Sequence, residues 1–302
     1  MVSSRGLKKI LCLVGPTASG KSELALSLAK KLDGEIINAD SRQFYKELNI
    51  GTAKLPKEEQ GGIPHHLIDS TSLLAPWSVA DFVKHASAIL KEICERGRVP
   101  LIVGGTGMYL KALLFGLDPI PQVDSDLRRR LRTRAEQGGI TSLHEELGKL
   151  DPESARRLSP KDPQRILRAL EVILQTGKPI HEFWKRGKPK FSYLKVGLCF
   201  ERKKLYEKIN ARVLQMIENG LKQEAEKLWE IYPENPVLGK TISYQEWKKY
   251  GFENDKTVIA EIQKNSRQFA KRQLTWLRHE EEIFWFDPSE KGIVDKIFQR
   301  FP

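Results

Sequence analysis

The chain has 302 residues, of which 40% are hydrophobic and 8% aromatic, and its 51 Lys and Arg against 39 Asp and Glu give a net charge of +12. This composition excludes a disordered chain, and the basic balance favours a polyanionic partner, nucleic acid above all. The longest apolar runs, such as Ile10–Val14, are far too short to cross a bilayer, and three well-separated cysteines offer no disulfide framework. We therefore expect a cytoplasmic protein with no membrane partner.

The first part of the chain alternates apolar strand-like runs with helical patterns. Such alternation is typical of a parallel sheet covered by helices. Ser78 begins the clearest helix, because its hydroxyl can cap a run with helical spacing that stops at Gly97. Strands are predicted at Lys9–Val14, Glu35–Asn38 and Val99–Val103, and helices at Lys21–Leu32, Ser78–Arg96 and Gly107–Phe115.

The pattern changes after Gly116, where helical runs predominate. Helices are predicted at Asp126–Gln137, Thr141–Lys149, Asp162–Thr176 and Pro179–Arg186, followed by a strand at Tyr193–Phe200, a long helix at Lys256–Arg278 and a short strand at Ile283–Phe286. The economical interpretation is a helical insertion between two strands of one α/β core. We expect a parallel-sheet core like that of the phosphate-loop (P-loop) NTPases, made of residues 1–117 and 191–302, with a basic helical insertion at 118–190.

The positive charge is concentrated in two segments. Ser125–Lys190 contains 16 Lys and Arg against 9 Asp and Glu, and Glu261–Glu280 contains 5 against 2, so the rest of the chain is nearly balanced. Most charged helices simply face solvent, and that alternative stays open for both segments. An excess of cations with few compensating acids nevertheless favours a surface that follows a phosphate backbone.

A complete phosphate-loop motif follows the first predicted strand and opens the first helix. Its eight residues are Gly15, Pro16, Thr17, Ala18, Ser19, Gly20, Lys21 and Ser22. The glycines let backbone N–H groups turn toward a phosphate, and the following helix adds its positive N-terminal end. Lys21 supplies an ammonium group, and the Ser22 hydroxyl suits Mg²⁺. The motif predicts phosphate and magnesium binding without specifying ATP, and a glycine-rich turn with no ligand is the structural alternative.

The acid that such a site needs is not where nucleotide hydrolases usually carry it. The Leu101–Val103 strand runs into Gly104–Gly107 without a carboxylate, whereas Asp40 follows the second predicted strand. Ligands of open parallel sheets bind outside the carboxyl ends of the strands, so we expect the phosphate loop, Asp40 and Thr106 to converge there. Helix caps are the structural alternatives, Asp40 for a segment Arg42–Leu48 and Thr106 for the helix that follows it.

Six ordered blocks of the chain resemble bacterial tRNA dimethylallyltransferases, the tRNA isopentenyltransferase (IPP transferase) family. The blocks are GPTASGKS (Gly15–Ser22), NADSRQFYKELNIGTAK (Asn38–Lys54), PHHLID (Pro64–Asp69), VGGTGMYLKALLFGL (Val103–Leu117), DPQRILRALEV (Asp162–Val172) and SRQFAKRQLTWLR (Ser266–Arg278). The resemblance implies transfer of the dimethylallyl group of dimethylallyl diphosphate to the exocyclic N6 amine of adenosine 37 in tRNA, with release of diphosphate. It also implies Mg²⁺ as the cofactor and the tRNA anticodon stem-loop as the partner, and we expect a monomer.

The resemblance also assigns roles to single residues. Asp40 is implied as the general base, Lys21 and Thr106 as further catalytic residues, and Gly15–Ser22 as the diphosphate site, with Ser22 close to Mg²⁺. Contacts with tRNA are implied for Asp40, Ser41, Arg42, Gln43, Thr106, Arg128, Gln164, Arg165, Ile166, Leu167 and Arg168. In the basic Glu261–Glu280 segment, we expect Arg272 and Gln273 to point toward the site, and Phe269 and Trp276 to lie in the core.

Two positions depart from the family pattern. Leu55 stands between the GTAK sequence and Pro56, where relatives often place the proline directly after the lysine. Ser243 stands where a glycine is usual, in a segment Lys240–Tyr244 that begins with lysine where some relatives carry arginine. The role of that segment is therefore not fixed by the pattern, whereas the main site is unaffected.

Other functions remain open at the level of the residues. A phosphate-loop small-molecule kinase, or an adenylate isopentenyltransferase acting on a free nucleotide, would leave the basic insertion without a role. An RNA-binding module with a vestigial loop would leave Asp40 unexplained. His65 and His66 with Asp69 resemble metal ligands only superficially, because their spacing fits no common site, and we expect a structural role for them.

Overall fold

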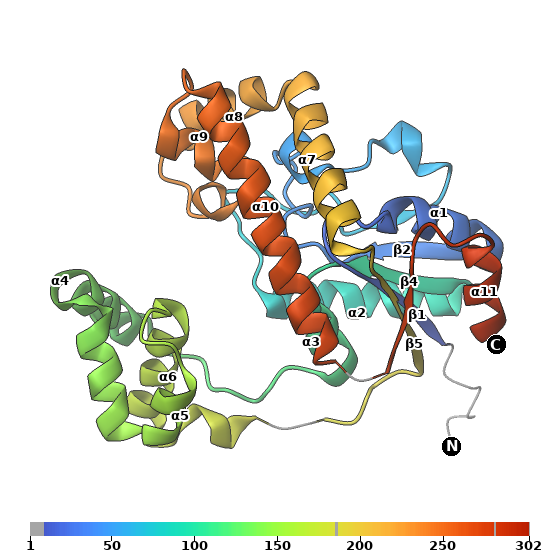
Figure 1. Ribbon diagram of the computed structural model, residues 1–302. Coiled ribbons are helices and arrows are strands. Elements are labelled where there is room, and N and C mark those ends of the chain that lie inside the picture. Colours follow the sequence, from blue (N-terminus) through green and yellow to red (C-terminus); the bar gives the residue numbers. More distant parts are fainter. Residues whose placement is uncertain (1–8, 185–186, 281, 302) are drawn as a thin grey trace, which may run out of the picture. The chain divides into compact units, whose positions relative to one another are not determined.

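The computed structural model describes residues 9–184, 187–280 and 282–301 (Figure 1). Residues up to Leu114 and from Pro189 onward form one compact unit, called here the core unit, and Phe115–Lys188 form a second, the helical unit. The sequence predicts the insertion at residues 118–190. No helix in the described part of the chain is long and apolar enough to span a membrane.

One parallel sheet of six strands lies at the centre of the core unit, counted over the described residues. Its strands are β1 (Ile10–Val14), β2 (Gly34–Asn38), β3 (His65–His66), β4 (Val99–Gly104), β5 (Tyr193–Leu198) and β6 (Ile283–Phe286). They lie in the order β3-β2-β4-β1-β5-β6, with Leu11 of β1 opposite Leu101 of β4 and Leu194 of β5. Because all the pairs are parallel, the carboxyl ends of the strands meet at one edge, the carboxyl edge.

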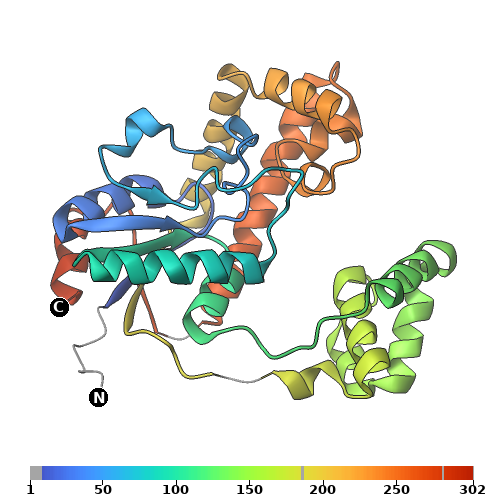
Figure 2. The same cartoon turned by 180° about the vertical axis from the view of Figure 1, so that it is seen from behind.

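Helices cover both faces of the sheet, which explains why β1 and β4 are continuous apolar runs. α1 (Lys21–Leu32) and α11 (Ile293–Arg300) share a core with one face. α2 (Val79–Glu95) and α3 (Gly107–Phe115) lie on the opposite face (Figure 1 and, from behind, Figure 2). Ser78 caps α2 through a reciprocal capping box, as its sequence predicts.

The chain after β5 adds four helices that pack against the loop following β2. They are α7 (Arg202–Glu218), α8 (Leu221–Ile231), α9 (Gln245–Tyr250) and α10 (Asp255–Arg278). Their shared core joins Tyr244 and Trp247, both fully buried, to Tyr45 and Leu48 of that loop. A large apolar core thus holds the loop after β2 in place, and with it the residues that begin the loop.

The helical unit contains α4 (Ser125–Leu150), α5 (Pro152–Arg157) and α6 (Pro163–Thr176), which bury a core of their own. Gly139 breaks the helical backbone of α4, with φ 75° and ψ 158°. The two helices predicted from the sequence at Asp126–Gln137 and Thr141–Lys149 are therefore the two arms of one kinked helix.

The expected fold class is confirmed, and α1, α3 and β6 agree with their predictions residue for residue. The helix predicted at Pro179–Arg186 is wrong: residues Ile180–Phe183 form a 3₁₀ turn, and residues 185–186 lie outside the described part. This turn is held by tertiary packing, because Ile180 lies in the core of the helical unit and Phe183 packs against that core. The segment 42–48 consists of turns and not a helix, and α5 was not predicted.

Candidate active site

The phosphate loop leaves β1 at Val14 and enters α1 at Lys21. A Cβ atom on Gly15 would lie 2.9 Å from the carbonyl oxygen of Leu198, so only glycine allows this close approach to the end of β5. Ala18 adopts a left-handed conformation with φ 61°, which costs a non-glycine residue about 1–2 kcal/mol. The surrounding contacts must therefore hold the loop in its curled form.

The ammonium group of Lys21 is folded against this loop. It donates to the carbonyl oxygens of Gly15 (3.0 Å) and Pro16 (2.6 Å). Burial lowers the pKa of Lys21 to about 8, while the charge of Asp40 opposes this shift and that of Arg212 adds to it. The ammonium is thus poorly solvated, and phosphate oxygens would be better acceptors for it than neutral carbonyls.

Asp40 lies just beyond the hydrogen-bond ladder of β2, where the N–H of Ala39 still donates to Val103 (2.8 Å). The Asp40 Oδ1 atom accepts from the N–H of Arg42 (2.9 Å), and the Asp40 N–H donates to Oδ1 of Asn38 (3.0 Å). The carboxylate therefore caps a turn and not the helix considered as an alternative. This cap uses one carboxylate oxygen and orients the other.

Arg212 of α7 is a site residue that the sequence analysis missed. Its guanidinium donates to Oγ1 of Thr17 (3.2 Å) and to the carbonyl of Thr52 (3.4 Å). Burial lowers the pKa of Arg212, and the charge of Asp40 opposes that shift. Two cations, Lys21 and Arg212, and one carboxylate thus act on one another at the carboxyl edge. No local pattern separates Arg212 from the other basic residues, because its partners are distant in sequence.

Thr106 lies in the loop between β4 and α3. A Cβ atom on Gly104 would lie 2.7 Å from the backbone of Ala39, so glycine lets the ends of β4 and β2 approach closely. This approach places Thr106 and Asp40 at adjacent strand ends. The Thr106 carbonyl accepts from the N–H of Tyr109 (3.1 Å), and no described residue is bonded to its hydroxyl, so the alternative of a side-chain cap finds no support.

Gln273 of α10 lies at the site, as expected, and is only 7% exposed. Its side-chain amide bonds to the phosphate loop and to the β4–α3 loop. Arg272 instead is exposed and lies over the ring of Phe269. Phe269 and Trp276 are half-buried, so the prediction that both are core residues is not met, because each lies at the margin of the buried stripe of α10.

The residues of the helical unit with implied tRNA contacts differ in their surroundings. Arg128 (3.0 Å) and Arg168 (3.3 Å) both pair with the buried carboxylate of Glu171. Gln164 and Arg165 are exposed, whereas Ile166 is fully buried and Leu167 half-buried in the core of this unit. The side chain of Ile166 therefore cannot make the implied contact with tRNA, because packing against α4 removes it from the surface.

The residues present fit a magnesium ion held mainly by a ligand's own phosphates. Ser22 is exposed in the first turn of α1, and no described residue is bonded to its hydroxyl. The described residues contain no cluster of three or more His, Cys, Asp or Glu suited to a metal. His65 bonds to the Ile63 carbonyl and His66 to Glu35, so both histidines are structural. Mg²⁺ commonly needs only one or two side chains beside phosphates and waters.

A phosphate loop, a carboxylate and two cations at the carboxyl edge of a parallel sheet define a phosphate-loop α/β enzyme. Comparison with protein families specifies which one. The IPP transferase family model matches residues 43–280, and the isopentenyl transferase model matches residues 8–76. The chain belongs to the IPP transferase family.

Individual relatives agree with this assignment. The tRNA dimethylallyltransferases of Carboxydothermus hydrogenoformans and Geobacillus thermodenitrificans are each 42% identical over 97% of this chain and 96% of their own. The full-length tRNA isopentenylpyrophosphate transferase of Bacillus halodurans superposes with a TM-score of 0.71 at 39% identity, over 97% of this chain and 94% of its own. A eukaryotic dimethylallyltransferase, described as acting on tRNA, gives 0.80 at 30% identity over 97% and 77%.

Proposed function

We propose that this chain transfers the dimethylallyl group of dimethylallyl diphosphate to the N6 amine of adenosine 37 in tRNA. The relatives that match nearly its whole length are tRNA dimethylallyltransferases. The observation that carries the proposal is the geometry of the carboxyl edge: the phosphate loop follows β1 with Lys21 folded against it and Arg212 bonded to Thr17, and Asp40 follows β2 in the same parallel sheet. A place for a diphosphate leaving group and a base for an amine thus lie together.

The donor side of the reaction needs stabilised negative charge. When the bond between the allylic carbon and the diphosphate oxygen breaks, carbon becomes positive and the departing oxygen negative. Backbone N–H groups of the loop, Lys21 and Arg212 are suited to stabilise that oxygen. Mg²⁺, held by Ser22 and diphosphate oxygens, would supply Lewis-acid assistance to the same departure.

The acceptor side needs a base, because the lone pair of the adenine amine is delocalised into the ring. In the proposed step the N6–carbon bond forms, diphosphate leaves, and Asp40 takes the proton from the amine. Thr106, at the adjacent strand end, has a hydroxyl that can orient the base. Adenosine 37 must leave the stack of the anticodon loop to reach this site.

Each unit carries residues that we propose to contact tRNA. Ser41, Arg42 and Gln43 follow the base Asp40 directly and would contact the extruded nucleotide. In the helical unit, the exposed cations would contact phosphates of the anticodon arm, while Glu171 orients Arg128 and Arg168. Because one chain carries every group named, we propose that it acts as a monomer.

One experiment tests the proposal against its rivals. The protein is incubated with labelled dimethylallyl diphosphate and Mg²⁺ together with unmodified tRNA, AMP or no acceptor. We expect label on tRNA alone, and loss of transfer when EDTA removes the metal. Transfer to AMP but not to tRNA would refute the proposed acceptor, and transfer undiminished by EDTA would refute the proposed cofactor.

A further inference from the structure

We propose that Gln273 is a positioning residue for the transfer reaction, and that its side-chain amide ties the phosphate loop to the loop that carries Thr106. The proposal rests on the proposed function, because it concerns the same site. Gln273 lies on α10, 256 residues away in sequence from Thr17, whose backbone it contacts.

The two ends of the Gln273 amide meet two different backbone groups. Its Oε1 atom accepts from the N–H of Thr17 (2.9 Å), and its Nε2 atom donates to the carbonyl of Gly105 (3.1 Å). One partner can only donate and the other can only accept, so the orientation of the amide is fixed. Because the side chain is 7% exposed, water cannot readily replace either bond, and a lost bond leaves an unsatisfied buried group.

Two glycines make room for α10 at this point. A Cβ atom on Gly105 would lie 2.1 Å from Nε2 of Gln273, and one on Gly107 would lie 1.7 Å from the ring of Trp276, one helical turn further along. Side chains at either position would push α10 away. Gly105 and Gly107, which follow β4, therefore form a docking surface for α10, and the docked helix presents Gln273 to both loops.

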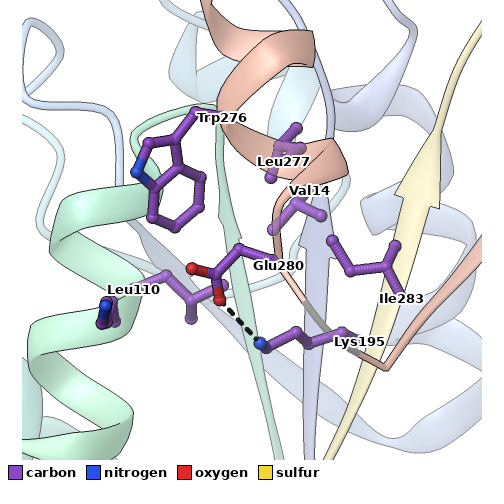
Figure 3. A pocket seen from close by; sticks show the side chains of 8 residues that line it. Val14, Leu110, Lys195, Trp276, Leu277, Glu280 and Ile283 are labelled. Atoms are coloured by element: carbon purple, nitrogen blue, oxygen red, sulfur yellow. Dashed lines mark hydrogen bonds and ion pairs between the residues drawn. The ribbon is translucent and has the colours of Figure 1, made fainter. Parts of the chain in front are cut away.

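The following turn of α10 anchors the helix against the sheet. Figure 3 shows Leu277 beside Val14 of β1, with Trp276 on the side of Leu110, and all four residues line one small pocket. Glu280 pairs there with the buried Lys195 of β5 (3.1 Å), the interaction drawn as a dashed line. These contacts fix how far Gln273 reaches along the carboxyl edge, without taking part in the chemistry themselves.

Thr17 is consequently held from two sides. Gln273 occupies its backbone N–H, and Arg212 donates to its hydroxyl (3.2 Å). We call the two hydrogen bonds of the Gln273 amide, to Thr17 and to Gly105, the clamp. The N–H of Thr17 is bonded within this clamp and is not one of the groups that contact diphosphate. The clamp sets the spacing between the leaving group on the phosphate loop and the amine beside Thr106, and an error of about 1 Å in such a spacing can cost about 100-fold in rate.

The test uses two variants of Gln273 and a matched control on the same helix. Gln273→Leu removes both hydrogen bonds at similar volume, and Gln273→Glu keeps the acceptor for Thr17 but sets a carboxylate against the Gly105 carbonyl. Gln263→Leu removes a hydrogen bond from α10 to the Asn210 carbonyl (3.3 Å) and touches neither loop. The measurements are thermal stability, tRNA affinity, calorimetric affinity for inorganic diphosphate with Mg²⁺, and the single-turnover rate at saturating substrates.

We expect both Gln273 variants to lose about 10- to 100-fold in single-turnover rate and several-fold in diphosphate affinity. Gln273→Leu should be less thermally stable than Gln263→Leu, because it leaves two backbone groups unsatisfied at a buried position, and tRNA affinity should stay within twofold of wild type. Equal rates and diphosphate affinities for Gln273→Leu and Gln263→Leu would overturn the proposal. If Gln273→Leu does not fold, the isosteric Gln273→Glu decides by the same criteria. If the wild type transfers nothing from dimethylallyl diphosphate, the proposed function fails, and the diphosphate affinities still decide the role of Gln273.

Discussion

Replacing Lys21 by methionine should make the protein more stable and nearly inactive at the same time. Burial lowers the pKa of Lys21 from 10.5 to about 8. At about 1.4 kcal/mol per pK unit, keeping the ammonium charged in the fold at pH 7 costs at most about 3.4 kcal/mol. Methionine cannot donate to the Gly15 and Pro16 carbonyls, and Lys21 retains some solvent contact, so we expect a net gain of about 1 kcal/mol. Transfer should fall at least about 100-fold, because a donor to the leaving oxygen is lost.

The stability gained by Lys21→Met should depend on pH. Lys21 has a pKa of about 8 in the folded protein and about 10.4 in the unfolded chain, so the folded state binds fewer protons between these values. The advantage of Lys21→Met is therefore fully present below pH 8 and disappears as the pH rises toward 10.4. Urea unfolding of both proteins at pH 7, 8, 9 and 10 measures it. Lys30→Met, exposed on the same helix, is the control and should show no such trend. A stability difference for Lys21→Met that stays constant from pH 7 to 10 would refute the reasoning.

Three further predictions concern the backbone, the base and the RNA surface. Ser243 has φ 86°, in the left-handed region that favours glycine, so Ser243→Gly should be about 1 kcal/mol more stable to urea than Ser243→Ala, which keeps the Cβ atom. Equal stabilities would mean that this backbone is not strained. Asp40→Asn keeps the acceptor for the Arg42 N–H but removes the base. The single-turnover transfer rate should fall about 10²- to 10⁴-fold, while the affinity for tRNA measured by filter binding should stay within threefold of wild type. A near-normal rate would exclude Asp40 as the base. Changing the exposed Arg129 and Arg132 to alanine together should flatten the plot of log affinity against log salt by about one to two units of slope, and an unchanged slope would assign them to an ordinary solvated surface.

Local sequence determined most of the elements and the centre of the site. The phosphate loop was placed correctly between β1 and α1, because its glycines and the hydrophobic runs around it are all neighbours in the chain. The position of Asp40 at the carboxyl edge followed from the rule that parallel strands share that edge. Local patterns failed at Pro179–Arg186, where residues with helical spacing form a 3₁₀ turn at Ile180–Phe183. The burial of Ile166 likewise depends on packing between α4 and α6, which the resemblance that implied its contact with tRNA does not show.

The sequence by itself thus determined a basic, phosphate-binding α/β chain with a carboxylate beside the loop, because motif, periodicity and charge are properties of neighbouring residues. Only the tertiary structure decided what surrounds that loop. Thr17 meets Arg212 across 195 residues and Gln273 across 256. Gln273 was expected near the site, but its two bonding partners were not, and no local pattern distinguishes Arg212 from the other arginines of the chain. Such contacts arise when a sheet and the helices after it bury their apolar faces together. That burial also lowers the pKa of Lys21, which no sequence pattern could have indicated.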